Sequence, residues 1–474
     1  MVNTTPSPVQ VLPGGSSDPF SAQGILITPR INQLITFIRD AYLPGIYITS
    51  FVKQLCDAPP RIITIAEGFK VMGRRNADKA WISMKEELND EGRALAWAGS
   101  YATVMARYCS KETAREIAVM GLSMKIRSIS ILKDKLSALR LDSQPDIAVL
   151  AQIVSLFRAS CKERDLTAAK VHAEIIRRLF NRITEGTNQI RTLFLTLISN
   201  DTEVAVSHMR RPFFNFETWV PHQLSKFWWS RGEPELPIVS LEYLDLDSSI
   251  CMSSTRTACI RLRRYLAIRK TPINLHDPVD FERCDAIFSC LSTYSMFDLG
   301  VLVSAYLDLS AANTPTMSPA QRYAEESFAL TTLYLHRWGI HQATVYGGDH
   351  RDSMHLTIIG CLRTTMKNAL RWCSPQDMDR YKTAFLWVFF YGARYEYRNT
   401  SSKLNFNEDQ SKFWFSQMFA RQARSMGLTA WAEIEEVLCR FVFYDFLERD
   451  PKSWFEETMF LFDIANEFNY DYEN

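Results

Sequence analysis

The stretch YKTAFLWVFFYGARYEYR at Tyr381–Arg398 decides how this chain is expected to fold. It contains eight consecutive apolar residues, from Ala384 to Tyr391. A membrane-spanning helix needs about 20 such residues, so this run is too short to cross a bilayer and predicts a helix buried on most of its faces. A chain organised around such a helix needs other helices to cover it.

The sequence that follows predicts two of these covering helices. Trp414, Met418 and Arg421 recur at helical spacing, and Gly427 then indicates a stop. Thr429 is a candidate N-cap for the second helix. One apolar stripe of that helix is formed by Ile434, Val437, Leu438 and Phe441.

Helical spacing recurs through most of the remaining chain, so the sequence predicts an all-α fold built as a large array of antiparallel helices. Residues 1–22 are rich in Pro, Gly, Ser and Thr, and predict a disordered N-terminal tail. Residues 23–474 are expected to form one helical domain, and no sheet is predicted. The segment ALAWAGSYATVMARY, at 94–108, alternates small and large residues, so close helix packing is expected there.

The overall composition gives no sign of a nucleic-acid or membrane partner. Lys and Arg number 54 against 53 for Asp and Glu. None of the ten cysteines forms a pair with the two-residue gap of zinc sites, which predicts reduced, buried thiols in an intracellular protein. No signal peptide and no membrane-spanning run is predicted either.

Sequence motifs of common enzymes are absent. No G-x-S-x-G, G-x-x-x-x-G-K or G-x-G-x-x-G occurs. His350 and His355, with Asp352 between them, are five residues apart, a spacing that does not place two imidazoles on one helical face. His172 lies among small and apolar residues and is expected to pack in the core. We therefore expect no enzyme activity, no catalytic residue, no cofactor and no metal.

The run RLRRYLAIRK is a candidate for a nucleic-acid or nuclear-import patch. The alternative, that it is the solvated face of an amphipathic helix, is the more common use of such a run. Its cationic residues are Arg261, Arg263, Arg264, Arg269 and Lys270.

Aromatic residues gather between positions 213 and 229, in a segment that four prolines interrupt between 212 and 237. They either cap the helical core, which we favour, or line a pocket for a small molecule between helices. The residues are Phe213, Phe214, Phe216, Trp219, Phe227, Trp228 and Trp229.

Several of these segments resemble one known family. LWVFFYGA at Leu386–Ala393, followed by FWFSQMF and GLTAWAEIEEVLCRF, resembles the C-terminal part of the fungal-specific transcription factor domain. AAKVHAEIIRRLF, which contains His172, and NDTEVAVSHMRRPFFNFETWVP at Asn200–Pro221 extend the likeness. It runs discontinuously from about residue 85 to residue 445.

The family is the helical regulatory region found downstream of a zinc-cluster DNA-binding domain. The resemblance implies a nuclear regulator of transcription that acts through other transcription regulators, through dimerisation with itself, or through a small-molecule effector. A zinc cluster needs six closely spaced cysteines, and the first cysteine here is Cys56. Direct DNA contact by that route is therefore not expected.

Two alternatives stay open beside this reading. One is a helical ligand-binding protein or enzyme of fungal metabolism with an aromatic-lined pocket, and the other is an interaction scaffold. A deep pocket with convergent ionisable groups would favour an enzyme, and a dry pocket would favour ligand sensing. An exposed apolar patch would favour a scaffold.

Overall fold

The computed structural model describes most of the chain and confirms the predicted all-α fold. Fifteen α-helices and one pair of short strands make up the regular structure of the described residues. The predicted tail at 1–22 lies outside them. The described residues are 25, 27–42, 62–65, 67–68, 88–138, 145–227, 245–268, 271–274, 276–311, 317–343, 353–399, 413–443 and 450–470.

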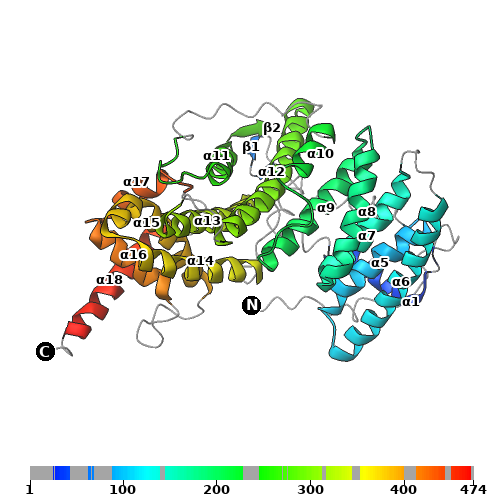
Figure 1. The fold of residues 1–474 in the computed structure, drawn as a ribbon, viewed down its shortest axis with the longest axis horizontal. Coiled ribbons are helices and arrows are strands. Elements are labelled where there is room, and N and C mark those ends of the chain that lie inside the picture. The colour runs from blue at the N-terminus through cyan, green and yellow to red at the C-terminus, as the bar shows by residue number, and fades with distance from the viewer. Residues whose placement is uncertain are drawn as a thin grey trace.

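The helices form an N-terminal and a C-terminal group that lie side by side (Figure 1). In the N-terminal group α5 packs against α6 and α7, and α7 packs in turn against α8 and α9. Its helices are α1 (Pro29–Phe37), which continues into one π-helical turn (Ile38–Tyr42), α5 (Glu91–Ala106), α6 (Lys111–Ala138), α7 (Ile147–Glu163), α8 (Leu166–Arg182), α9 (Asn188–Ser207) and α10 (Trp219–Phe227).

The C-terminal group is larger, and α9 joins the two groups by packing on α12 and α14. Within it α12, α13 and α14 pack in succession, and α15 packs against α13 and α16. Its helices are α11 (Ser253–Ile268), α12 (Pro278–Ser310), α13 (Pro319–Ala343), α14 (Ser353–Trp372), α15 (Pro375–Asn399), α16 (Trp414–Ser425), α17 (Trp431–Cys439) and α18 (Pro451–Tyr470).

One small sheet departs from the expectation of no sheet. Strands β1 (Ile62–Thr64) and β2 (Pro272–Asn274) pair antiparallel, with Ile63 opposite Ile273. Each strand has three residues, which is too short for apolar and polar residues to alternate visibly in the sequence.

The predicted central helix is the core of the C-terminal group. Every residue from Ala384 to Tyr391 on α15 is at most 1% exposed. The Trp387 ring stacks on Phe441, with centroids 5.2 Å apart, and its Nε1 donates a hydrogen bond to the carbonyl of Val442 at 3.1 Å. The prediction of a helix buried on most of its faces is confirmed.

The helix boundaries after α15 correct one prediction. α16 ends at Ser425, and Gly427 has a φ of +70°, the left-handed conformation that commonly stops a helix. Ala430, and not Thr429, occupies the N-cap position of α17. The Glu433 carboxylate accepts hydrogen bonds from the backbone N–H groups of Thr429 and Ala430, so the cap comes from inside the first turn.

α12 differs from the expectation that no segment could cross a membrane. Among the described helices it is long and apolar enough to do so by length and composition. However, 61% of its most apolar stretch of 18 residues is buried inside the protein, where α12 packs on α9, α11 and α13. Its composition is therefore explained by its place in the core.

Small residues bring α5 and α6 close together, as their alternation with large residues predicted. A Cβ atom added to Gly121 would lie 2.9 Å from the Cβ of Ala102, and one added to Gly99 would lie 3.2 Å from the carbonyl oxygen of Gly121. These separations leave no room for a side chain, so α6 is held against α5 along one face.

Candidate functional site

Two of the described arginines of the predicted basic run contact other parts of this chain. Arg261 donates a hydrogen bond to Asp298 Oδ1 at 2.7 Å. Arg263 is buried and donates to the backbone carbonyls of Asp245 and Cys439, at 2.5 and 3.1 Å. Both side chains therefore join α11 to neighbouring segments.

Of the remaining cations of the run, the structure describes only Arg264. Arg264 is half-buried, and Arg269 and Lys270 lie outside the described residues. None of the three described arginines of the run is fully exposed. A nucleic-acid or import role for them stays a prediction.

The aromatic segment packs into the core of the N-terminal group. Phe214 and Phe216 are buried, and Phe214 stacks on Trp219 with centroids 4.8 Å apart. Phe157 meets the ring edges of Phe213 and Phe214, both at 5.8 Å. This geometry matches core capping, the favoured prediction. Trp228 and Trp229 lie outside the described residues.

The histidines singled out in the sequence do not form a metal site within the described part of the chain, where no group of three or more His, Cys, Asp and Glu side chains could hold a metal ion. His355 is buried with its ring 5.3 Å from that of Tyr334, while His350 and Asp352 lie outside the described residues. Burial lowers the pKa of His172 to about 4, consistent with a packed, neutral ring.

Three buried carboxylates share one structural role, which is to accept hydrogen bonds from two consecutive backbone N–H groups. Each thereby ties a loop or a helix start to the core. Asp201 binds the N–H groups of Phe213 and Phe214, Glu325 those of Cys251 and Met252, and Glu396 those of Phe415 and Ser416.

Asp298, on α12, differs from these three because one of its oxygens has no hydrogen-bond partner. Its Oδ1 accepts from Arg261, but its Oδ2 is unpaired and lies 3.8 Å from His336 Nε2, too far for a hydrogen bond. His336, on α13, donates from Nε2 to the carbonyl of Ala258 at 3.1 Å, which leaves its Nδ1 unpaired. The hydroxyl of Tyr265, on α11, is also buried and unpaired.

The chemistry of this group follows from its burial. Burial raises the pKa of Asp298 to about 7, although the cationic Arg261 acts to lower it. Burial lowers the pKa of His336 to about 3, so the imidazole is neutral. The group therefore offers a carboxyl that can hold a proton near neutral pH, a neutral imidazole and a phenol. Together they could hydrogen-bond a small polar molecule.

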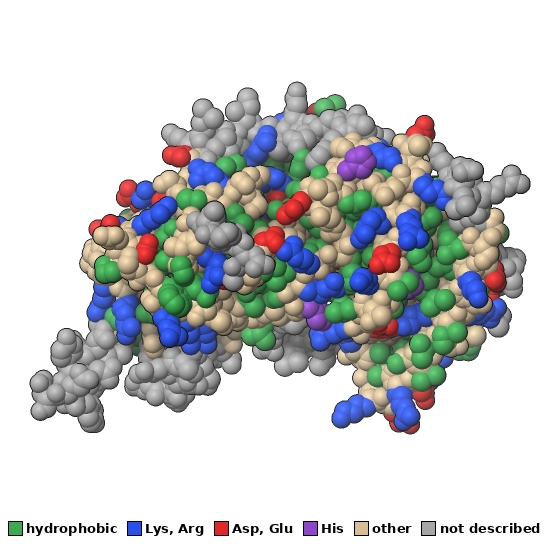
Figure 2. Space-filling model, viewed as in Figure 1, with side chains coloured by type: hydrophobic (Ala, Val, Ile, Leu, Met, Phe, Trp, Pro, Cys, Tyr) green, Lys and Arg blue, Asp and Glu red, His purple; other side chains and the backbone are tan. Residues whose placement is uncertain are grey.

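A second candidate lies on the surface of α6, at the right-hand edge of the molecule in Figure 1. Four large apolar side chains on one face are exposed, and Figure 2 shows hydrophobic side chains over this end of the molecule. We call them the α6 ridge: Val119 (63% exposed), Leu122 (54%), Ile126 (60%) and Ile129 (46%).

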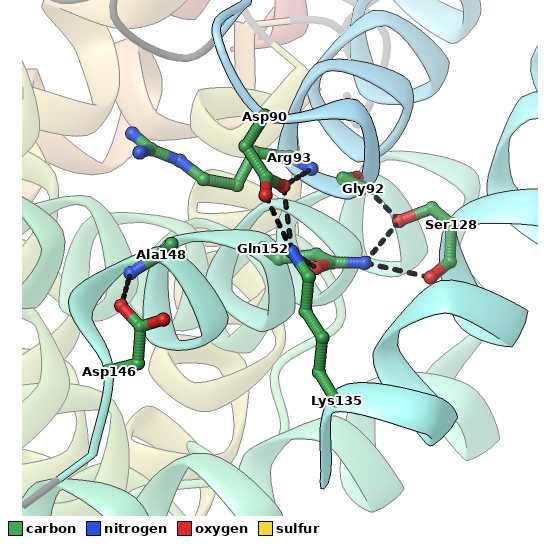
Figure 3. A network of polar contacts seen from close by, with 8 residues as sticks. All are labelled: Asp90, Gly92, Arg93, Ser128, Lys135, Asp146, Ala148 and Gln152. Atoms are coloured by element: carbon green, nitrogen blue, oxygen red, sulfur yellow. Dashed lines mark hydrogen bonds and ion pairs between the residues drawn. The ribbon is translucent and has the colours of Figure 1, made fainter. Parts of the chain in front are cut away.

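The opposite face of α6 is fixed by a buried polar network (Figure 3). Gln152 Nε2 donates to the carbonyl of Ser128 at 2.8 Å, and the Ser128 hydroxyl donates to the carbonyl of Gly92 at 2.7 Å. Lys135 Nζ donates to the Asp90 carboxylate at 2.8 Å and to Gln152 Oε1 at 3.1 Å. Burial acts to raise the pKa of Asp90, but Lys135 and a backbone N–H outweigh it and the pKa is lowered. The ridge is thus carried on a helix held in one orientation.

Sequence reasoning identified neither the α6 ridge nor the polar group at Asp298. A signal for the ridge was present, because α6 carries two rows of residues at helical spacing. The inner row is Ile117, Gly121, Met124, Ser128 and Leu132, and the outer row is the ridge. Asp298 had no comparable signal, since a lone Asp in an apolar helix does not reveal its partners.

Comparisons with known proteins give no family for this chain. No protein-family model matches it, no curated protein matches it, and no solved structure matches its fold.

Proposed function

We propose that this chain is a regulatory protein that acts by binding other proteins, in the role implied by its resemblance to the fungal-specific transcription factor domain. In this role it would work in the nucleus with other transcription regulators or with itself, without contacting DNA through a zinc cluster. The α6 ridge carries the proposal, because a row of exposed aliphatic side chains is typical of a protein-binding surface.

Two of the buried carboxylates have a structural role. Both oxygens of Asp201 and of Glu396 accept backbone hydrogen bonds, so these groups serve the fold. The resemblance supplies the regulatory part of the proposal, and the ridge supplies the contact surface.

The proposal is tested by tethering the full chain to an unrelated DNA-binding module upstream of a reporter gene in a fungal cell. We expect the tethered chain to change reporter output several-fold, and Leu122→Glu on the ridge to remove most of that change. The matched control is Leu356→Glu, at another exposed leucine on α14, which should behave like the wild type.

Location in the cell provides an independent check. A fluorescent fusion of the full chain should enter nuclei. Strict exclusion from nuclei, or a reporter response that Leu122→Glu leaves unchanged, would contradict the proposed function.

A second candidate function, response to a small-molecule effector, rests on the unpaired atoms of Asp298, His336 and Tyr265. A small polar ligand that hydrogen-bonds these atoms would stabilise the folded chain in proportion to its affinity. Thermal-shift screening with polar metabolites tests this candidate. A compound that binds at Asp298 should raise the melting temperature of the wild type but not that of the Asp298→Asn variant. A compound that stabilises both binds elsewhere.

A further inference from the structure

We infer that the N–H group of His336 has two alternative acceptors, and that ionisation of Asp298 moves its hydrogen bond from α11 to α12. The acceptors are the backbone carbonyl of Ala258 on α11 and the carboxyl of Asp298 on α12. The inference concerns side chains that the second candidate function also uses, but it needs no ligand. It therefore goes beyond the proposed function and does not rest on it.

His336 has one N–H group to donate. A neutral imidazole carries its hydrogen on a single ring nitrogen. Nε2 lies 3.1 Å from the carbonyl oxygen of Ala258, and a carbonyl oxygen can only accept, so the hydrogen is on Nε2. Nδ1 is then an acceptor, and it has no hydrogen-bond partner. Any hydrogen bond from His336 to a second acceptor must therefore come from the same N–H group.

Asp298 lacks a donor that its ionised carboxyl would need. Oδ1 accepts a hydrogen bond from Arg261 at 2.7 Å, whereas Oδ2 has no partner. The Asp298 side chain is only 2% exposed, so bulk water does not hydrate this oxygen. A buried carboxylate oxygen without a hydrogen bond is unfavourable, and the neutral carboxyl avoids burying that charge. Ionisation of Asp298 therefore creates a demand for one more N–H group.

The distances allow His336 to meet this demand. Its Nε2 lies 3.8 Å from Asp298 Oδ2, just beyond the range of an N–H···O hydrogen bond. A movement of less than about 1 Å brings the two atoms into that range. The two acceptors belong to different helices, so an N–H group that turns towards Asp298 weakens its bond to Ala258.

Asp298 is the member of this group whose charge changes near neutral pH. Burial raises the pKa of Asp298 to about 7, against the opposing effect of Arg261 on α11. Burial lowers the pKa of His336 to about 3 and raises the pKa values of Cys259 and Tyr265, so these three side chains stay neutral. Among the described residues, α9 and β2 also pack on α12 but place no charged group that acts on the Asp298 pKa.

The consequence is a weaker connection between α11 and α13 above neutral pH. Below it, two hydrogen bonds join neighbouring residues of α11 to α13. One runs from His336 to Ala258, and the other joins Cys259 Sγ to Thr332 Oγ1 at 3.1 Å. When the pH rises through about 7, the first of these two bonds is lost to Asp298. The group is thus a pH-dependent fastening of α11.

The hydrogen bond of His336 can be followed by NMR of the full chain with 15N-labelled histidine. The chain has eight histidines, and the His336→Gln variant identifies the His336 signal by its loss. We expect the Nε2 proton to move downfield in one step between about pH 5 and about pH 9, because a carboxylate is a stronger acceptor than a carbonyl. Asp298→Asn cannot ionise, so its signal should not move.

Two results of the NMR experiment would overturn the inference. One is a His336 signal in the wild type that does not change with pH. The other is a signal that moves as far in Asp298→Asn as in the wild type. Circular dichroism would establish that both variants are folded.

Amide hydrogen exchange of the wild type gives a second measurement that needs no variant. Dividing the intrinsic exchange rate by the observed rate at each pH removes the direct effect of pH on exchange. Between about pH 5 and about pH 9, α11 should lose several-fold more protection than α8, which packs on α7 in the N-terminal group. Equal losses in α11 and α8 would mean that α11 is not selectively loosened, and would overturn the inference.

Discussion

The two groups of helices differ in how completely they bury their apolar residues. In the C-terminal group α15 is enclosed by α13, α14, α16 and α17, and the eight residues from Ala384 to Tyr391 are buried. Among the described residues of the N-terminal group, α6 is covered on one face, and the α6 ridge is exposed on the other. Burial of apolar surface is the main stabilising term in folding. The first group thus uses its apolar surface for stability, and the second leaves an apolar row exposed.

The buried polar groups show the same contrast. The network around Gln152 fixes the orientation of α6 and so presents the ridge, whereas Glu325 and Glu396 fasten loops onto the closed C-terminal core. Asp298 differs from these two carboxylates, because one of its oxygens has no hydrogen-bond partner.

The largest effect on stability is expected at Trp387, the ring stacked inside the C-terminal core. Trp387→Ala should lower the free energy of unfolding by about 3–5 kcal/mol, because it leaves a cavity and removes the hydrogen bond to Val442. Urea unfolding measures this loss. Trp372→Ala, at an exposed tryptophan on α14, should cost far less. Equal losses would mean that the core does not close around α15.

A smaller effect is expected from the pH dependence of Asp298. Its pKa in the folded chain is about 7, above the ordinary value of 3.8. The stability from this group is therefore fully present below about pH 4 and is lost as the pH rises through about 7. Between pH 5 and pH 8 the wild type should lose about 1–3 kcal/mol that Asp298→Asn does not lose.

Unfolding at several pH values checks this prediction. Asp379→Asn, at an exposed carboxylate on α15, should keep the wild-type dependence. If Asp298→Asn also kept the wild-type pH dependence, the Asp298 carboxyl would be ionised in the folded chain at neutral pH. Asp298 would then not differ from the other buried carboxylates.

The smallest effect on stability is expected at the α6 ridge. Ile126→Ser should change the free energy of unfolding of the monomer by no more than about 0.5 kcal/mol, because the side chain makes few contacts within the chain. Urea unfolding at low protein concentration measures it. A loss of several kcal/mol would place Ile126 in the core and remove the contrast between the two helix groups.

How far the sequence predicts the structure depends on whether a pattern has one explanation or two. Eight consecutive apolar residues on α15 are too few to span a membrane and predicted a buried helix, and the prediction was confirmed. The arginines of α11 had two explanations, and spacing could not show that Arg263 would reach backbone carbonyls of two distant segments.

The candidate surface was harder to predict for the same reason. A helix with apolar rows on two faces can be buried on both, and only the position of its neighbours shows which row is left exposed. The unpaired oxygen of Asp298 depends on contacts among three helices, which no local pattern records.

The most direct test of this contrast is footprinting of side chains with hydroxyl radicals on the full chain. We predict that Val119, Leu122, Ile126 and Ile129 are modified as readily as the exposed Val171 and Leu356, whereas the eight residues from Ala384 to Tyr391 are protected. Ridge residues that are as well protected as those of α15 would contradict the claim that α6 leaves an apolar row exposed.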